Sequence, residues 1–246
     1  MTILDSTLRD GAQGTGIAFS VEDKLAAVRL LDQLGVAYIE AGNPGSNPKD
    51  AEFFARAREL PLSHARLVAF GSTRRKNILP EEDGNLQSLA AAGTPCCAVF
   101  GKCWKFHVDC VLETTYEENF RMIEESCRFL KERGKEVIFD GEHFLDGWKD
   151  DRDFALQALE AAAPGGADVL CLCDTNGGAF PQEVSQVVGE VARRFDLPVA
   201  VHFHDDCGMA VANSVVGVLA GASQVQGTLL GFGERCGNAN LSTIIP

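Results

Sequence analysis

Short apolar, β-branched runs alternate with longer stretches of helical periodicity along this chain, and this alternation constrains the fold more than any other feature. The predicted strands are 3–7, 37–41, 66–71, 96–100, 136–140, 167–173, 198–203 and 223–227. The predicted helices between them are 21–34, 48–59, 83–92, 116–133, 151–162, 181–195 and 208–220. Such alternation is typical of a parallel sheet covered by helices. The 246 residues also match the roughly 250 that a closed barrel needs. We therefore predict an α/β fold, a (β/α)8 TIM barrel.

The first predicted helix shows how the local signals agree. Ser20 is a suitable N-cap, and Asp23 three residues later completes a pattern like a capping box. Apolar residues then recur at helical spacing, and Gly35 is a natural residue to end the helix.

The last unit of the alternation is incomplete. After the eighth predicted strand, the loop through residues 231–238 leads into only a few residues before Pro246. We expect one catalytic barrel domain over residues 1–246, cut short at or near its eighth helix. Two explanations stay open: the chain is a fragment of a longer protein, or another molecule covers the apolar flank between the last and first units.

Composition narrows the possible partners and locations. A formal charge of −13 argues against nucleic acid as the main partner, because phosphate binding needs a basic surface. The nine cysteines include no CxxC pair, we find no signal peptide, and no apolar run approaches the roughly 20 residues of a membrane span. We expect a cytoplasmic protein with reduced cysteines and no membrane partner.

Asp10 and the pair His202 and His204 are the strongest functional signal. Side chains alternate along a strand, so the two histidines point the same way from the end of the seventh predicted strand. Asp10 follows the first strand, close to the seventh in a closed barrel, and Asn238 follows the eighth. One carboxylate with two imidazoles can hold a catalytic divalent metal. The alternative is a turn-capping aspartate beside two core histidines.

Four further residues are candidates for substrate binding or catalysis. Arg9 could stabilise an enolate or alkoxide, because a guanidinium stays charged at any working pH. Glu142 is a candidate general acid or base at the end of the fifth strand, and Thr175 offers a hydroxyl to a substrate carboxylate. Glu40 is a weaker candidate for substrate binding. The alternatives are a surface salt bridge for Arg9 and ordinary turn chemistry for the others.

Two long motifs carry a family resemblance. Residues 8–13, with Lys24 further on, resemble the first signature of the 2-isopropylmalate and homocitrate synthases, and residues 202–214 resemble their second signature. These enzymes belong to a superfamily of metal-dependent lyases and carboxyltransferases built on a TIM barrel, the DRE-TIM metallolyases. Four more segments look like the citramalate synthase subgroup, namely residues 42–50, 70–75, 100–102 and 231–240.

The resemblance implies a metal-dependent acyltransferase that condenses acetyl-CoA with pyruvate to citramalate and CoA, on a route to isoleucine. It matches Asp10, His202 and His204 to metal ligands, with Asn238 as a fourth, the metal being Mn, Mg or Zn. It matches Arg9 and Thr175 to groups that hold the 2-oxo acid, and Glu142 to an acidic residue of the reaction. It also implies a homodimer, and a linker and C-terminal regulatory domain that these 246 residues lack.

Other functions stay open at this point. Asn43 and Lys105 differ from what close citramalate synthases lead us to expect, so another 2-oxo acid acceptor is possible. A metal-dependent C–C lyase or aldolase is a second alternative. Lyases acting on hydroxymethylglutaryl-CoA use a cysteine after strand eight, where Cys236 stands within a run that resembles the synthases. The third alternative is a catalytically silent barrel.

Overall fold

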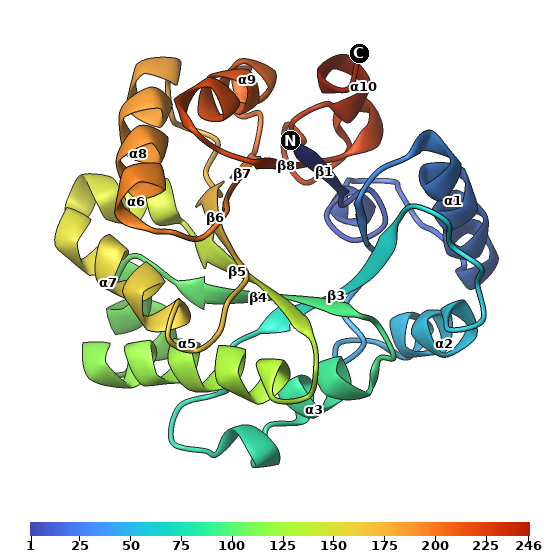
Figure 1. Ribbon diagram of the computed structural model, residues 1–246, viewed down its shortest axis with the longest axis horizontal. Helices are drawn as coiled ribbons and strands as arrows, with labels where there is room; N and C mark the ends of the chain where they lie inside the picture. Colours follow the sequence, from blue (N-terminus) through green and yellow to red (C-terminus); the bar gives the residue numbers. More distant parts are fainter.

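The computed structural model describes all residues, 1–246, and its strands close into one parallel barrel in sequence order (Figure 1). The strands are β1 Thr2–Asp5, β2 Tyr38–Glu40, β3 Arg66–Ser72, β4 Cys96–Lys102, β5 Glu136–Glu142, β6 Val169–Asp174, β7 Val199–Phe203 and β8 Gln224–Gly227. β1 closes the ring by pairing with β8, from Thr2 opposite Gln224 to Asp5 opposite Gly227. The predicted (β/α)8 barrel is confirmed.

Helices surround the barrel on its outer side (Figure 1). They are α1 Val21–Leu34, α2 Pro48–Ala57, α3 Gly84–Ala91, α4 Lys105–His107, α5 Tyr116–Lys131, α6 Phe144–Asp150, α7 Arg152–Ala162, α8 Pro181–Arg194, α9 Ala210–Ala220 and α10 Leu241–Ile244. Short 3-10 segments cover Gly11–Gln13, Pro80–Glu82 and Leu229–Gly231, and a π-helical turn covers Val108–Leu112. None of the helices is long and apolar enough to cross a membrane.

The predicted caps of the first helix are confirmed. Ser20 accepts a hydrogen bond from the backbone N–H of Asp23, and Asp23 accepts one in return from the backbone N–H of Ser20. Gly35 ends α1 with a φ of 86°, in the left-handed region that glycine adopts without strain.

The sequence did not predict α6, which lies between β5 and α7. Its seven residues are too few to show a clear helical period, and His143 precedes it with a φ of 54°. Strand β5 also runs two residues further than predicted, so Glu142 is its last residue. This extension carries the Glu142 side chain to the carboxyl end of the barrel.

Side-chain alternation divides the buried residues into two groups. Outward-facing strand residues join the larger core against the helices, whereas a small cluster fills the barrel interior: Leu4, Val68, Cys96, Ala98, Ile138, Val169, Cys171, Cys173 and Ala200. Towards the carboxyl ends of the strands the interior becomes polar, with buried Glu40, Asp140, His202 and Gln226. Since active sites of TIM barrels lie at that end, this polar layer is the expected position of a functional site.

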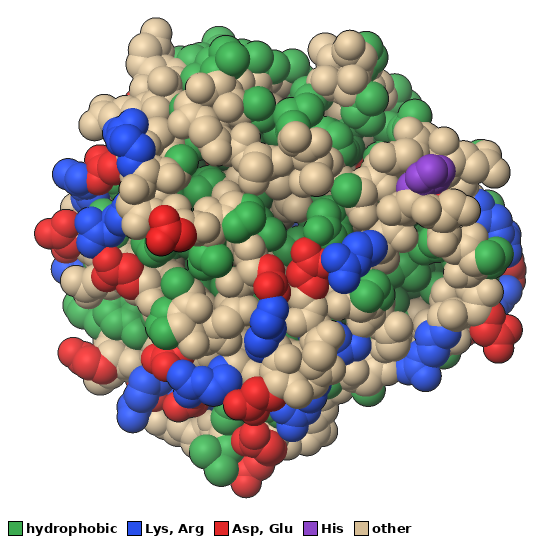
Figure 2. Space-filling model, viewed as in Figure 1, with side chains coloured by type: hydrophobic (Ala, Val, Ile, Leu, Met, Phe, Trp, Pro, Cys, Tyr) green, Lys and Arg blue, Asp and Glu red, His purple; other side chains and the backbone are tan.

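The last unit of the barrel is short, as predicted. After β8 the only α-helix is α10, four residues long, between α9 and α1 in the outer ring (Figure 1). Figure 2 shows hydrophobic side chains concentrated over α9 and α10. Leu219 of α9 is 82% exposed and Val215 48% exposed. The expected apolar flank is therefore present.

A buried ion pair joins α1 to α2 and so links the first βα unit to the second. Lys24 of α1 is 2% exposed, and its Nζ donates to Asp50 Oδ1 of α2 at 2.6 Å and to the carbonyl of Ala41 at 2.7 Å. Asp50 also accepts from the backbone N–H of Asn43 and from the side chain of Asn47. This network fixes the loop after β2.

We predict that Lys24→Met lowers the free energy of unfolding by about 3–5 kcal/mol, because it leaves the Asp50 carboxylate buried without its cation. Urea unfolding measures the change. As a control, Arg56→Met breaks the exposed pair with Glu22 and should cost less than about 1 kcal/mol. A similarly small loss for Lys24→Met would show that the neighbouring N–H donors suffice for Asp50.

Candidate metal centre and active site

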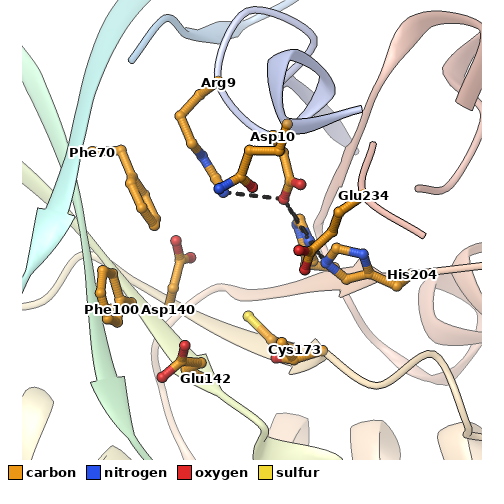
Figure 3. Close-up of a pocket in the computed structure, with 12 residues that line it drawn as sticks. Arg9, Asp10, Phe70, Phe100, Asp140, Glu142, Cys173, His204 and Glu234 are labelled. Atoms are coloured by element: carbon orange, nitrogen blue, oxygen red, sulfur yellow. Dashed lines mark hydrogen bonds and ion pairs between the residues drawn. The ribbon is translucent and has the colours of Figure 1, made fainter. Parts of the chain in front are cut away.

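Asp10, His202 and His204 converge at the carboxyl end of the barrel, and Figure 3 shows Asp10 and His204 pointing toward each other. Asp10 lies in the turn after β1, His202 in β7, and His204 directly after β7. Asp10 Oδ2 is 3.3 Å from His202 Nε2 and 3.9 Å from His204 Nε2, and the two Nε2 atoms are 3.3 Å apart. One potential ligand atom from each residue therefore faces the same point.

The polar atoms of this group fit a divalent cation. Asp10 Oδ1 and Asn238 Oδ1 are both buried without a hydrogen-bond partner. Asn238 lies beside His204 through a backbone bridge, and its Nδ2 donates to the carbonyl of Phe232, which leaves Oδ1 free to accept. Buried oxygens are costly when unpaired, and a cation bound here would give them a partner.

A chain of side chains orients His202. Its Nδ1 lies 3.3 Å from Gln226 Oε1, and Gln226 Nε2 donates to Asp140 Oδ1 at 3.2 Å. Because the amide oxygen of Gln226 can only accept, Nδ1 carries a proton, and Nε2 is the nitrogen whose lone pair a cation can use when the imidazole is neutral. This is the arrangement that a metal-binding imidazole needs from its surroundings.

The charges around the group act on its protonation. Burial opposes ionisation of Asp10, yet Arg9 and His202 hold the pKa of this carboxyl well below its usual range. Burial also works against a charged His202, but the hydrogen bond and charge of Asp10 raise its pKa above the usual value. For His204, burial and the charge of His202 lower the pKa to about 4. Asp10 is thus an anion over the whole physiological range.

Arg9 is held rigidly beside Asp10. Its Nε donates to Glu40 Oε2 at 2.6 Å, one Nη lies 3.1 Å from Asp10 Oδ2, and its guanidinium lies 3.8 Å from the ring centre of Phe70. Burial acts against the cation, but Glu40 and Asp10 outweigh it and raise the pKa of Arg9. The remaining N–H donors of Arg9 are available to an anionic ligand.

These residues border a cavity of about 260 Å³, slightly below the range of about 300–1,000 Å³ that is usual for small-molecule sites. Figure 3 shows Phe70 and Phe100 together on one side and Asp10 with His204 on the other. The two rings stack with centres 5.3 Å apart. The lining residues are Arg9, Asp10, Gln13, Phe70, Phe100, Asp140, Glu142, Cys173, Thr175, His202, His204 and Glu234.

Glu142 and Thr175 lie on neighbouring parts of the cavity wall. Glu142 forms an ion pair with Lys102 at the end of β4. Thr175 Oγ1 accepts a hydrogen bond from the backbone N–H of His143 at 2.9 Å. Since that bond occupies an acceptor position, the hydroxyl proton of Thr175 is free to be donated into the cavity.

The cavity unites most of the residues predicted from the sequence. Its lining includes six of them: Arg9, Asp10, Glu142, Thr175, His202 and His204. Two others do not line it. Glu40 is fully buried behind Arg9, and Asn238 is buried next to His204, to which a backbone bridge joins it.

Sequence reasoning missed Asp140, Gln226 and the two phenylalanine rings as parts of the site. Asp140 stands two residues before Glu142 on the same strand, so side-chain alternation alone could have shown that it faces the same way. Burial and the charge of Glu40 raise the pKa of Asp140 to about 6. No comparable signal in the sequence marks Gln226, since its role depends on the register between β7 and β8.

The barrel and its convergent carboxylate and imidazoles define a TIM-barrel protein with a candidate metal centre at the carboxyl ends of the strands. The chain belongs to the HMGL-like family, whose model matches residues 1–246. It is 52% identical to an (R)-citramalate synthase of Aquifex aeolicus (strain VF5) and 48% identical to one of Sulfolobus acidocaldarius, each match covering 99% of this chain. A probable 2-isopropylmalate synthase of Methanopyrus kandleri is 36% identical.

The chain spans about half the length of these relatives, 46% of the Aquifex protein and 47% of the Sulfolobus protein. Among solved structures, the HMG-CoA lyase of Bacillus subtilis matches with a TM-score of 0.82 over 99% of this chain and 84% of its own. At 22% identity, that likeness concerns the fold alone.

We predict that the affinity of the centre for Mn²⁺ falls as the pH falls through the pKa of His202. Below that pKa the cation must displace a proton from the imidazole, so affinity should drop about tenfold per pH unit. His204, with its pKa of about 4, is unprotonated throughout this range and adds nothing. Calorimetric titration from about pH 8 to about pH 5.5 measures the dependence.

The variant His202→Ala should lose Mn²⁺ binding, whereas His64→Ala, which removes an exposed histidine outside the site, should keep it. An affinity that stays constant with pH, or binding that survives His202→Ala, would contradict the assignment of the ligands.

Proposed function

We propose that this chain is the catalytic barrel of an enzyme that condenses acetyl-CoA with pyruvate to give citramalate and CoA. The observation that carries the proposal is the cavity in which Arg9 and the group of Asp10, His202 and His204 face Glu142 and an aromatic wall. The (R)-citramalate synthases among its relatives support the same reaction. The chain spans only part of the length of these relatives, and we extend the proposal to the activity of the whole protein.

The metal in this proposal is a divalent cation held by Asp10, His202 and His204, with Asn238 Oδ1 as the fourth protein ligand. Mixed imidazole and oxygen ligands suit Mn²⁺ or Zn²⁺, and Mg²⁺ is the third candidate. When bound, the cation supplies Lewis-acid polarisation of the keto group. The remaining steps depend on the chain's own side chains.

Arg9 and Thr175 would bind the carboxylate of the 2-oxo acid. Arg9 presents fixed N–H donors, because Glu40 and Phe70 already hold its guanidinium in place. Thr175 adds its hydroxyl proton, since the backbone N–H of His143 orients its oxygen. In this proposal Glu40 therefore acts on the substrate through Arg9.

Glu142 is the proposed acid–base residue. Its carboxylate takes a proton from the methyl group of the acetyl thioester, and the resulting enolate carbon forms a bond to the keto carbon of pyruvate. The keto oxygen gains the electron pair as an alkoxide, which Arg9 stabilises by its charge until it is protonated. Hydrolysis of the thioester then releases CoA and citramalate.

The size of the cavity favours a small acceptor. Phe70 and Phe100 stack against each other in the cavity wall, and in this proposal that wall limits the side chain of the 2-oxo acid. At about 260 Å³ the cavity has room for pyruvate and an acetyl group, while most of CoA would lie outside. This supports pyruvate over a larger 2-oxo acid acceptor.

Two alternatives have less support. A lyase of the cysteine-dependent kind would need a thiol in the loop after β8 that reaches the substrate, but Cys236 is exposed and does not line the cavity. A catalytically silent barrel would not account for a cavity that brings the candidate metal ligands together with Arg9. A homodimer, a cytoplasmic location and a single catalytic domain over residues 1–246 stay predictions from the sequence.

We predict that the Mn²⁺-loaded protein releases free thiol from acetyl-CoA when pyruvate is added. A panel of 2-oxo acids of increasing side-chain size, followed with a thiol reagent, measures the preference. Release that is greatest with a branched acceptor would replace pyruvate in the proposal. No release with any acceptor, in protein that binds Mn²⁺, would overturn the proposed reaction for this chain.

Glu142→Gln is expected to lower kcat by about 10²–10⁴, because it removes the proton acceptor while keeping the shape of the side chain. Thiol release under saturating pyruvate measures the change. Glu136→Gln is a matched control, because Glu136 begins the same strand at the opposite end of the barrel. Equal rates for the Glu142 variant and the control would exclude Glu142 as the base.

A further inference from the structure

Two thiols and a carboxylate meet inside the barrel, next to the metal centre described above. Cys171 and Cys173 point inward from β6, and Asp140 points inward from β5, where it is paired with Cys171 in the strand register. One ligand atom from each of these three residues lies within 4.8 Å of the others. All three are buried.

The geometry of the two thiols matches that of a zinc site. The sulfur atoms are 3.9 Å apart, with no disulfide between them. Two thiolates bound tetrahedrally at about 2.3 Å from a zinc ion are about 3.8 Å apart. The spacing therefore needs almost no rearrangement to hold a cation of this size.

The type of ligand distinguishes this group, the lower site, from the centre of Asp10, His202 and His204, the upper site. Thiolates prefer soft cations such as Zn²⁺ and Cd²⁺, whereas Mg²⁺ and Mn²⁺ prefer oxygen ligands. Burial disfavours a free thiolate, so only a cation that binds sulfur strongly will displace the thiol protons. Asp140 and Cys173 line the active-site cavity, so a cation can enter by that route.

We propose that Asp140, Cys171 and Cys173 form a second cation site, selective for a thiophilic divalent cation of the Zn²⁺ class. On binding, each thiol releases one proton to solvent, and the two thiolates with the carboxylate form three bonds to the cation. A water molecule can complete the tetrahedron.

Occupancy of the lower site acts on the upper one through Gln226. Asp140 accepts the hydrogen bond from Gln226 Nε2, and Gln226 Oε1 orients His202. A bound cation withdraws negative charge from the Asp140 carboxylate, which weakens this hydrogen bond, and its positive charge repels a cation at the upper site. One equivalent of Cd²⁺ at the lower site therefore weakens Mn²⁺ binding at the upper one.

Cadmium provides a readout that does not depend on activity, because its bond to a thiolate gives an ultraviolet charge-transfer band. The background for the experiment is the chain with its exposed cysteines replaced, Cys110→Ser, Cys207→Ser and Cys236→Ser. Titration with Cd²⁺ should give one equivalent that produces the band. A second equivalent, at the imidazole centre, should bind without it.

The double variant Cys171→Ser/Cys173→Ser should lose the band and one equivalent of Cd²⁺. Cys97→Ser is the matched control, because Cys97 is also buried in a barrel strand but belongs to the core on the helix side. It should keep both. Asp140→Asn, which preserves shape, should weaken the band-forming equivalent at least tenfold, and circular dichroism verifies that each variant is folded.

A folded background protein without the band would overturn the proposal, and so would a band that survives the loss of both cysteines. In either case the thiols are packing groups only. Mn²⁺ affinity, measured by electron paramagnetic resonance with and without one equivalent of Cd²⁺, tests the coupling: the effect of Cd²⁺ should disappear in Cys171→Ser/Cys173→Ser, and an effect that persists there is direct competition at the imidazole centre and contradicts the coupling. None of these results depends on whether the chain condenses acetyl-CoA with pyruvate.

Discussion

The pairing of β1 with β8 is the constraint on which the rest of the molecule depends. It joins the two ends of the chain, from Thr2 beside Gln224 to Asp5 beside Gly227. Parallel strands around a closed barrel all present their carboxyl ends at one face. Asp10, which follows β1, therefore meets His202 and His204 almost two hundred residues further along the chain.

Charge compensation then determines what this face can bind. Arg9 contributes one cation between two buried carboxylates, Glu40 and Asp10, which leaves a net negative charge beside two imidazoles. In the proposed function a divalent cation completes this balance, and the anionic substrate approaches both the cation and Arg9. The aromatic rings of Phe70 and Phe100 supply the apolar remainder of the cavity. The polar wall with Asp10 and the apolar wall with Phe70 and Phe100 therefore lie on opposite sides of the cavity.

The interior of the barrel is layered by chemistry as well as by size. Apolar residues such as Leu4 and Val68 fill its lower part, and imidazoles and carboxylates line its upper end. Cys171 and Cys173 stand at the boundary, beside Asp140 and near His202. Soft and hard ligands therefore lie in adjacent layers, joined by the hydrogen bonds of Gln226.

The sequence by itself determined the order of the strands and of the main helices, the caps of α1 and the candidate ligand set of Asp10, His202 and His204, because these follow from local periodicity and short motifs. Only the tertiary structure placed Glu40 behind Arg9, linked Gln226 to Asp140 and His202, and set Phe70 against Phe100. These contacts join different strands, so they depend on register and barrel closure. Local sequence carries no direct record of either.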